Sequence, residues 1–242
     1  MEGPSIVILK EEVRKFKGKK ILKVSGNSKI DQQRLVNQKI IDFKSWGKHF
    51  LICFKDFSLR IHFLMFGSYR INEQKNATPR LRLEFTNGEL NFYTCSVQFI
   101  DQPLDDVYDW KADVMSDQWD SKRALQKLSR LKETMICDVL LDQQIFAGSG
   151  NIIKNEALYR VKLHPENLAG NIPLSKRKMI VDAVRDYSFD FLHWKKKFEL
   201  RKHWLIYTKK KCPLNHIVVK KYTGKGKRRS FFCAVCQQFY KS

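Results

Sequence analysis

Four residues near the C-terminus have the types and spacing of a metal site. Cys212 and His216 form one close pair, Cys233 and Cys236 form a second, and sixteen residues separate the two pairs. Two such pairs of soft ligands joined by a loop are what a tetrahedral zinc ion requires. Because protein ligands fill all four positions, we expect a structural zinc. The stretch between the pairs alternates around "TGKG", which predicts a β-hairpin closed at its base by the metal.

The turn "GSGN" is a second and weaker signal. Gly148 and Gly150 lead into a helical pattern, and Asn151 is expected at the N-cap of that helix. The backbone N–H groups and the dipole at such a terminus suit a phosphate. An ordinary connection between two helices explains the same residues equally well.

The start of the chain places Glu2 directly after the α-amine of Met1. An α-amine has a pKa of about 7.7 to 8.0, so part of it is unprotonated near neutral pH. A neighbouring carboxylate can move protons to and from a reacting group. The pair therefore has the chemistry of a nucleophile and its acid–base partner, although most chain termini have no such role.

Composition indicates a polyanionic partner. The chain has 242 residues, 43% of them hydrophobic, which allows two or three small domains, and its net charge is +21. Such a charge favours nucleic acid, with a membrane surface as the rival. No apolar run approaches the roughly 20 residues of a spanning helix, and we expect no signal peptide. We therefore expect an intracellular monomer, cytoplasmic or associated with the nucleoid, with no membrane partner.

The hydrophobic pattern predicts an α+β protein with three parts. Apolar spacing predicts a helix over 4–17, followed by short alternating strands up to about residue 100. Asn87-Gly88 between two of these runs is typical of a hairpin, so this part is expected to be an antiparallel β-sandwich. The aspartate-rich stretch 101–120 reads as a linker, and helical periods follow to residue 194. The predicted domains are a β-sandwich catalytic domain with flanking helices (1–118), a helical domain (119–198) and a zinc finger (199–242).

Motif order adds a family resemblance. "MEGP", "WGKHF", "HFLMFG", "LLDQQIFAGSGNIIKNEAL", "HP" and a terminal "CAVCQ" occur in the order found in the formamidopyrimidine-DNA glycosylase and endonuclease VIII family. The chain resembles that family over nearly its whole length. The resemblance implies an N-terminal β-sandwich, a helix-two-turn-helix domain and a zinc finger, with damaged DNA bound in a basic cleft. The Cys-His-Cys-Cys set is more similar to some endonuclease VIII-like members than to the four-cysteine enzymes.

The resemblance also implies catalytic roles. In the family the N-terminal amine attacks C1′ of the damaged nucleoside, expels the base and forms a Schiff base, and elimination then cuts the strand. Met1 stands at the position of this nucleophile, and Glu2 matches the catalytic acid beside it. Lys48 matches a lysine that contacts the phosphate and sugar at the lesion. Without the family, Lys48 reads as a solvated strand residue.

Further residues match DNA contacts of the family. Asn151 matches the phosphate-binding asparagine of the two-turn motif, and Arg228 matches the arginine at the tip of the zinc hairpin. Arg229 takes that role if the hairpin register shifts by one. Met65 matches the side chain that fills the hole left by the flipped nucleotide. On residue type alone, Met65 reads as core.

The chain departs from the family pattern in two places. Met1 stands where the family has proline, so the nucleophile is a primary amine. "SVQFID" stands where formamidopyrimidine enzymes carry an arginine-rich damage-probing loop, which leaves Phe99 as the candidate wedge. The segment before the zinc finger is also short for a loop that caps 8-oxoguanine. The expected substrates are therefore oxidised bases, pyrimidines rather than 8-oxoguanine, together with ring-opened purines or abasic sites.

Two functions are consistent with these residues. The first is a base-excision DNA repair glycosylase with abasic-site lyase activity. The second is a damaged-DNA or abasic-site binding protein of the same fold, with weak or no glycosylase activity because Met1 replaces proline. A zinc-finger RNA-binding protein is a distant third.

Overall fold

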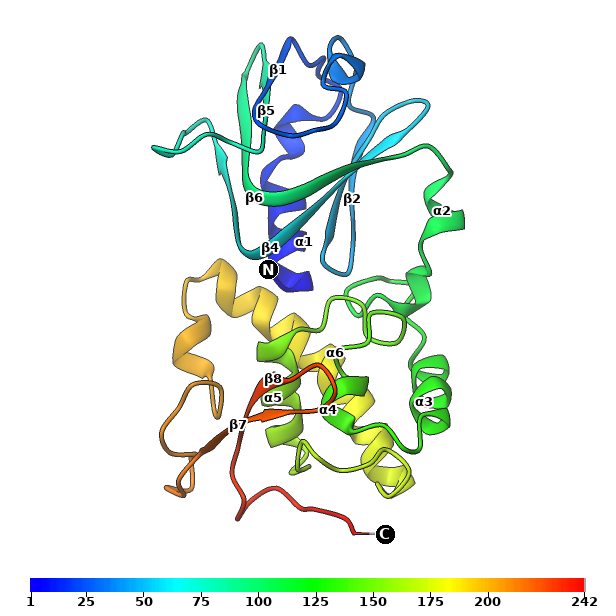
Figure 1. Ribbon diagram of the computed structural model, residues 1–242, viewed down its shortest axis with the longest axis vertical. Coiled ribbons are helices and arrows are strands. Elements are labelled where there is room, and N and C mark those ends of the chain that lie inside the picture. The colour runs from blue at the N-terminus through cyan, green and yellow to red at the C-terminus, as the bar shows by residue number, and fades with distance from the viewer. Residues whose placement is uncertain (242) are drawn as a thin grey trace. The chain divides into compact units, whose positions relative to one another are not determined.

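The computed structural model describes residues 1–241 as two compact units (Figure 1). The first unit comprises Met1 and Ser5–Asp109, and the second comprises Glu2–Pro4 and residues 110–241. The short segment Glu2–Pro4 thus belongs to the second unit, whereas Met1 before it and Ser5 after it belong to the first. Ser242, the last residue of the predicted zinc finger, lies outside the described residues.

A single antiparallel sheet forms most of the first unit. Its six strands lie in the order β1-β5-β6-β4-β3-β2. The predicted N-terminal β-sandwich with flanking helices is confirmed in its antiparallel strands and its helices, and the six strands are hydrogen-bonded in one continuous sheet. The elements are α1 (Gly3–Glu12), η1 (Arg14–Phe16), β1 (Lys23–Ser25), η2 (Gln33–Leu35), β2 (Asp42–Trp46), β3 (His49–Cys53), β4 (Ser58–Ile71), β5 (Leu81–Phe85), β6 (Gly88–Ile100) and α2 (Leu104–Val107).

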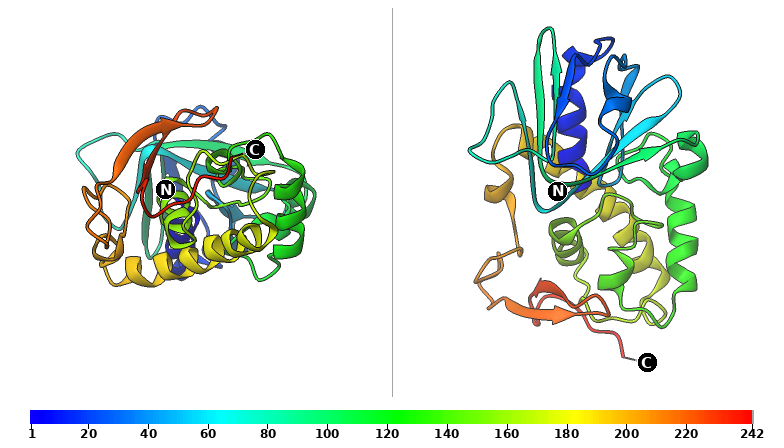
Figure 2. Two further views of the ribbon diagram at one scale, coloured as in Figure 1. Left: turned by 90° about the horizontal axis from the view of Figure 1, so that it is seen from below. Right: turned by 45° about the horizontal axis from the view of Figure 1, so that its top comes forward.

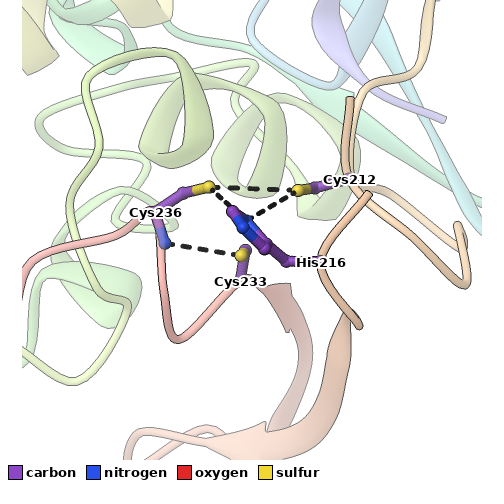
Figure 3. Close-up of side chains that lie close together, drawn as sticks. All are labelled: Cys212, His216, Cys233 and Cys236. Carbon is purple, nitrogen blue, oxygen red and sulfur yellow. Dashed lines mark hydrogen bonds between the residues drawn. The ribbon is translucent and has the colours of Figure 1, made fainter. Parts of the chain in front are cut away.

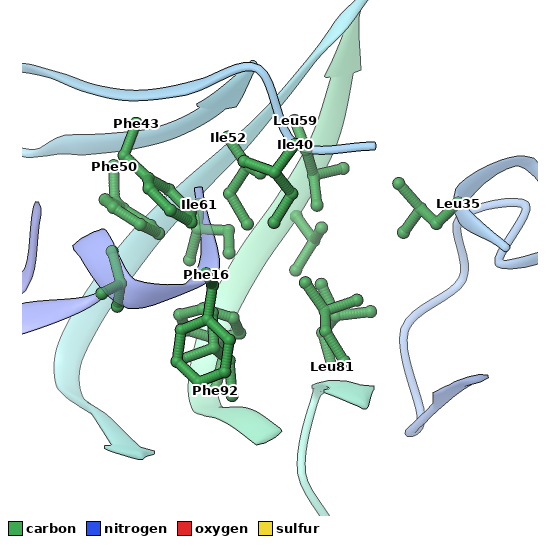
Figure 4. Close-up of a cluster of buried hydrophobic side chains, with 14 of the residues drawn as sticks. Phe16, Leu35, Ile40, Phe43, Phe50, Ile52, Leu59, Ile61, Leu81 and Phe92 are labelled. Carbon is green, nitrogen blue, oxygen red and sulfur yellow. The ribbon is translucent and has the colours of Figure 1, made fainter. Parts of the chain in front are cut away.

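The core of the first unit is apolar, as the alternating pattern predicts. Every second residue of a strand faces the same side of a sheet, so alternating sequences bury one face. Phe92 of β6 is fully buried in this core, and α1 and η1 add Leu9 and Phe16. Figure 4 shows side chains from β2, β3, β4, β5 and β6 converging on this cluster.

Two local predictions are confirmed in this sheet. The hairpin around Asn87-Gly88 is present, and Phe85 pairs with Gly88 across it. The segment "SVQFI", which stands where formamidopyrimidine enzymes carry a damage-probing loop, forms the end of strand β6 as the alternating pattern up to residue 100 predicts, and Phe99 pairs with Leu59 of β4. Its alternating apolar residues continue the sheet pattern, which explains why these residues extend β6.

The second unit is mainly helical and ends in a β-hairpin. Helix α3 (Ser121–Arg130) is followed by the short helix α4 (Ile136–Val139) and, after a turn, by helix α5 (Asn151–Arg160). Asp120 accepts a hydrogen bond from Arg123 N at the start of α3. The elements are η3 (Trp110–Ala112), α3 (Ser121–Arg130), α4 (Ile136–Val139), α5 (Asn151–Arg160), α6 (Leu174–Lys196), η4 (Leu200–His203), β7 (Val219–Thr223) and β8 (Arg228–Phe232).

Helix α5 is the centre of the second unit. Every residue from Ile153 to Tyr159 is buried, including the charged Lys154 and Glu156. Helix α6 packs on one side of α5, and strand β8 packs on another (Figure 2). A helix surrounded in this way has no polar face turned to water, so its polar side chains need partners inside the protein. Among the described residues, no helix is long and apolar enough to cross a membrane.

Candidate functional site

The carboxylate of Glu2 closes the N-terminus of helix α5. Ile152 N donates to Glu2 Oε1 at 2.7 Å, and Ile153 N donates to Glu2 Oε2 at 3.2 Å. The first N–H groups of a helix have no partner within it, and a negative charge is favoured there. Both oxygens of Glu2 are therefore fixed in direction. Gly3 N donates to Gly148 O at 2.9 Å and holds the same segment against the turn.

The turn before α5 is built to admit Glu2. Gly150, and not the predicted Asn151, is the N-cap residue, and Asn151 is the first residue of the helix. A Cβ at Gly150 would lie 2.5 Å from Glu2 Cδ, so only glycine leaves room for the carboxylate. The predicted N-cap role of Asn151 is therefore wrong, because a residue far away in sequence does the capping. In the described part of the chain, Asn151 Oδ1 is buried without a hydrogen-bond partner.

In the first unit, the positive charge of the α-amine of Met1 acts on a nearby histidine. The side chain of Met1 packs against the hydrophobic core. Burial lowers the pKa of His62, and the positive charges of the N-terminal amine and of Lys48 lower it further. Lys48 lies in the two-residue turn between β2 and β3, beside His49. Nothing in the spacing of His62 along the sequence indicated that its charge would interact with that of the amine.

His49 and His62 form a small cluster in the same unit. The two are paired across β3 and β4, with ring centroids 5.4 Å apart and edge-to-face. His49 Nδ1 lies 3.1 Å from the hydroxyl of Tyr108. Burial lowers the pKa of His49 to about 4, so its imidazole is neutral near pH 7.

The two predicted wedge residues lie in different settings. Met65 is 74% exposed, between Leu64 and the 80% exposed Phe66, where the pairing of β4 with β6 shifts register. This is an apolar tip without core packing. Phe99 is instead half-buried, with its ring 5.4 Å from that of Phe57. This packing does not support a wedge role for Phe99.

The four predicted metal ligands come together at the base of the β7–β8 hairpin (Figure 3). One ligand atom from each lies within 4.8 Å of the others, and Cys212 Sγ is 3.9 Å from Cys236 Sγ. Zinc bonds of about 2.3 Å to sulfur in a tetrahedron place two sulfurs roughly 3.8 Å apart. His216 Nδ1 lies 3.2 Å from Cys236 Sγ. The donor set and its spacing therefore fit a tetrahedral ion.

Helix α5 also holds the hairpin that carries the basic tip. Lys154 Nζ donates to Arg229 O at 3.1 Å and to Ser230 Oγ at 3.0 Å. Asn155 Oδ1 accepts from Phe231 N at 2.8 Å. Burial lowers the pKa of Lys154 to about 8. Sequence reasoning missed both residues, because a lysine in a helix is usually exposed and gives no signal of burial.

The register of the hairpin separates the two candidate arginines. Arg228 pairs with Thr223, which is buried, whereas Arg229 pairs with Tyr222, which is 64% exposed. Successive strand residues face opposite sides, so the two side chains leave the hairpin in opposite directions. Ser230, two residues further along β8 and so on the same face as Arg228, accepts a hydrogen bond from Lys154 of α5. The positive charge of Arg228 also contributes to the lowered pKa of Lys154.

Comparison with known proteins identifies the family. Residues 2–100 match the formamidopyrimidine-DNA glycosylase N-terminal domain, and residues 112–187 match the formamidopyrimidine-DNA glycosylase H2TH domain. The chain belongs to the formamidopyrimidine-DNA glycosylase and endonuclease VIII family. Endonuclease 8-like 2 of Mus musculus is 36% identical over 196 residues, which cover 74% of this chain and 57% of that protein. Endonuclease 8-like 3 of Xenopus laevis is 31% identical over 90% of this chain and 38% of its own length. The chain thus spans little more than half the length of the first of these relatives.

Solved structures show the same fold. A viral DNA glycosylase superposes with a TM-score of 0.85 at 24% identity, covering 98% of this chain and 100% of the viral one. Lactococcus lactis formamidopyrimidine-DNA glycosylase, bound non-covalently to DNA containing an AP site, superposes with a TM-score of 0.86 at 23% identity and the same coverage. At these identities the likeness establishes the fold alone.

Proposed function

We propose that this protein is a base-excision DNA glycosylase with abasic-site lyase activity. One observation carries the proposal: the residue next to the α-amine of Met1 is a carboxylate whose two oxygens are both fixed by helix α5. The amine attacks C1′ as the bond from C1′ to the base breaks, and the base leaves with a proton. The ring bond from C1′ to O4′ then breaks as O4′ takes up a proton and the nitrogen loses one, which leaves an imine at C1′. The imine activates the proton on C2′, whose removal expels the 3′ phosphate. Glu2 is the group that gives and takes these protons.

The proposal requires that the α-amine of Met1 carries no covalent modification. A primary amine forms an imine, whereas the family's proline forms a permanently charged iminium. The methionine form therefore keeps the lyase step and has a slower base-excision step. Intact-mass measurement of the purified protein checks that Met1 is the first residue and is unmodified.

We further propose that Lys48, Asn151 and Arg228 contact phosphates and that Met65 fills the space of the flipped nucleotide. The exposure of Met65 and the direction of Arg228 support these roles. The preferred substrates are oxidised pyrimidines over 8-oxoguanine, since only a short segment joins α6 to Cys212. Cys212, His216, Cys233 and Cys236 hold one structural zinc ion, which supplies a fixed base for the hairpin.

Borohydride reduction on duplex DNA with an abasic site tests this function. The unmodified protein should form a covalent product, and Glu2→Gln should form at least tenfold less. Glu133→Gln, which changes an exposed carboxylate, is the matched control and should behave as the unmodified protein. Binding of abasic DNA without any covalent product would favour the alternative, a damaged-DNA binding protein, for which the replacement of proline by Met1 is the supporting observation.

A further inference from the structure

A fully exposed phenylalanine follows the end of helix α6. Phe198 is 96% exposed, the highest value among the large hydrophobic residues that the structure describes. Its backbone has φ 59°, in the left-handed region. A bulky residue rarely adopts this conformation, because its Cβ approaches the following carbonyl. Phe198 therefore combines two unfavourable features, and no packing against residues 1–241 explains its size.

The backbone around Phe198 is held in place. Lys197 is the C-cap of α6, Phe198 N donates to Lys195 O at 3.0 Å, and Glu199 N donates to Trp194 O at 2.8 Å. This is the Schellman ending of a helix, in which the position of Phe198 is normally glycine. Glycine would fit here without strain, yet the chain has a phenylalanine.

The segment after Phe198 is also fixed. The rings of Trp194 and His203 are stacked with centroids 4.2 Å apart and planes 5° from parallel. This contact joins the last turn of α6 to η4, so the loop that carries Phe198 is closed at both ends. The ring of Phe198 is therefore presented to solvent from a defined backbone position.

Cations surround Phe198. The exposed residues Lys195, Lys196 and Lys197 precede it, and Arg201 and Lys202 follow it. The one acidic residue among them, Glu199, pairs with Lys202 at 3.2 Å. Lysines at a helix C-terminus are favoured by the helix dipole, which explains the charges but not the phenylalanine. An exposed aromatic ring among cations is the arrangement with which proteins bind single-stranded nucleic acid, since bases stack on the ring while cations contact phosphates.

We propose that Phe198 is a stacking platform for an unpaired base of the DNA, with the neighbouring lysines and Arg201 contacting the flanking phosphates. The inference rests on the proposed function, because it takes DNA as the partner. A paired base in a duplex has both faces covered by its neighbours, so a ring of this kind selects unpaired nucleotides. Nothing in this role requires Phe198 to touch the reacting atoms.

Phe198→Gly tests the proposal and separates it from a role in folding. Glycine relieves the left-handed strain, so the Tm of the variant should equal or exceed that of the unmodified protein. Its affinity for a single-stranded oligonucleotide containing 2-aminopurine should fall roughly tenfold, which is about 1.4 kcal/mol. The quenching of 2-aminopurine fluorescence on binding should also be lost. Thr208→Gly is the matched control, since Thr208 is exposed with φ 58° and should leave DNA binding unchanged.

The outcomes distinguish this inference from the proposed function. If the unmodified protein gives no borohydride product on abasic duplex, the glycosylase and lyase proposal fails, while stacking is judged on single-strand binding alone. Single-strand affinity of Phe198→Gly equal to that of the unmodified protein would overturn the inference, as would the absence of any binding by the unmodified protein. Loss of binding to vesicles of phosphatidylserine and phosphatidylcholine, with DNA binding unchanged, would assign Phe198 to a membrane surface instead and would equally overturn it.

Discussion

The two units differ in the kinds of side chain that they bury. The core of the first unit is built from aliphatic and aromatic side chains on alternating strand positions. The second unit also has an apolar core, but through its centre runs helix α5, on which Lys154, Asn155 and Glu156 are all buried. Apolar packing is non-directional, whereas each buried polar group needs a partner in a defined direction. The second unit therefore fixes the position of distant chain segments through hydrogen bonds to one helix.

The segments fixed in this way are those with candidate roles. The start of α5 binds Glu2, its middle binds the backbone of β8, and Glu156 binds the segment that leads to Cys212. Glu156 accepts hydrogen bonds from three successive N–H groups at 2.9, 3.0 and 2.7 Å, those of Leu205, Ile206 and Tyr207. Changes in α5 should thus affect the site, while changes in the apolar core should affect stability alone.

Loss of the metal should give the largest difference in stability between the two units. Cys233→Ser should lose the zinc, and structural zinc contributes about 10 to 16 kcal/mol of apparent binding free energy in zinc-finger peptides. Amide hydrogen exchange in β7 and β8 should become fast, while β3 and β4 keep their protection. The purified unmodified protein should contain one zinc per chain. Cys53→Ala, a buried cysteine of the first unit, is the control. Protection of β8 that survives the loss of metal would contradict the account.

The next effect concerns Glu156. Glu156→Ala leaves three backbone N–H groups without their acceptor and should lower the free energy of unfolding of the second unit by about 3 kcal/mol. Phe92→Leu, in the fully buried core of the first unit, should cost only about 1 kcal/mol. Urea denaturation followed by a probe in each unit measures both values. If Glu156→Ala lowered the free energy of unfolding by less than Phe92→Leu does, the two interiors would not differ in the way described.

A pH titration tests the first unit alone. The folded protein holds His49 at a pKa of about 4, against 6.5 for the free side chain. As the pH falls from 6.5 to 4, the unfolded chain takes up a proton before the folded one, so stability decreases. The loss should be roughly 2 kcal/mol after reduction for partial exposure. In His49→Gln, the free energy of unfolding should change less between pH 6.5 and 4. His193→Gln, at an exposed position on α6, should leave this pH dependence as it is.

The smallest effect distinguishes the two arginines of the hairpin. Arg228→Ala should weaken DNA binding by about 1.5 kcal/mol through loss of a charge-assisted contact to phosphate. The slope of log affinity against log salt should fall by about 0.9, the value for one phosphate. Arg229→Ala should have less effect on abasic duplex, because its side chain leaves the opposite face of the hairpin. Equal losses in both variants would show that strand register does not separate their roles.

The sequence predicted those features that depend on local pattern. Alternation predicted the strands of the first unit because one face of the sheet is buried. The ligand spacing predicted the cluster of Cys212, His216, Cys233 and Cys236 at the base of the hairpin, because each pair must turn around one ion. The domain boundaries at 118/119 and 198/199 remain predictions.

Contacts between residues distant in sequence could not be predicted. Asn151 has the residue type of an N-cap, but Glu2 occupies that place from nearly 150 residues away, and Gly150 admits it. The burial of Lys154 has no periodic signal either, because its partners are backbone and hydroxyl groups of β8. Sequence patterns indicate which residues are buried. They do not indicate which polar groups form hydrogen bonds with each other across the fold.

The central claim is that the α-amine of Met1 is the nucleophile and that Glu2, held by helix α5, is its proton partner. Peptide mapping by mass spectrometry of the borohydride-reduced complex with abasic DNA tests it directly. The DNA remnant should be attached to the N-terminal peptide, at the α-nitrogen of Met1. A remnant on Lys48 or on any other lysine, with Met1 unmodified, would contradict it.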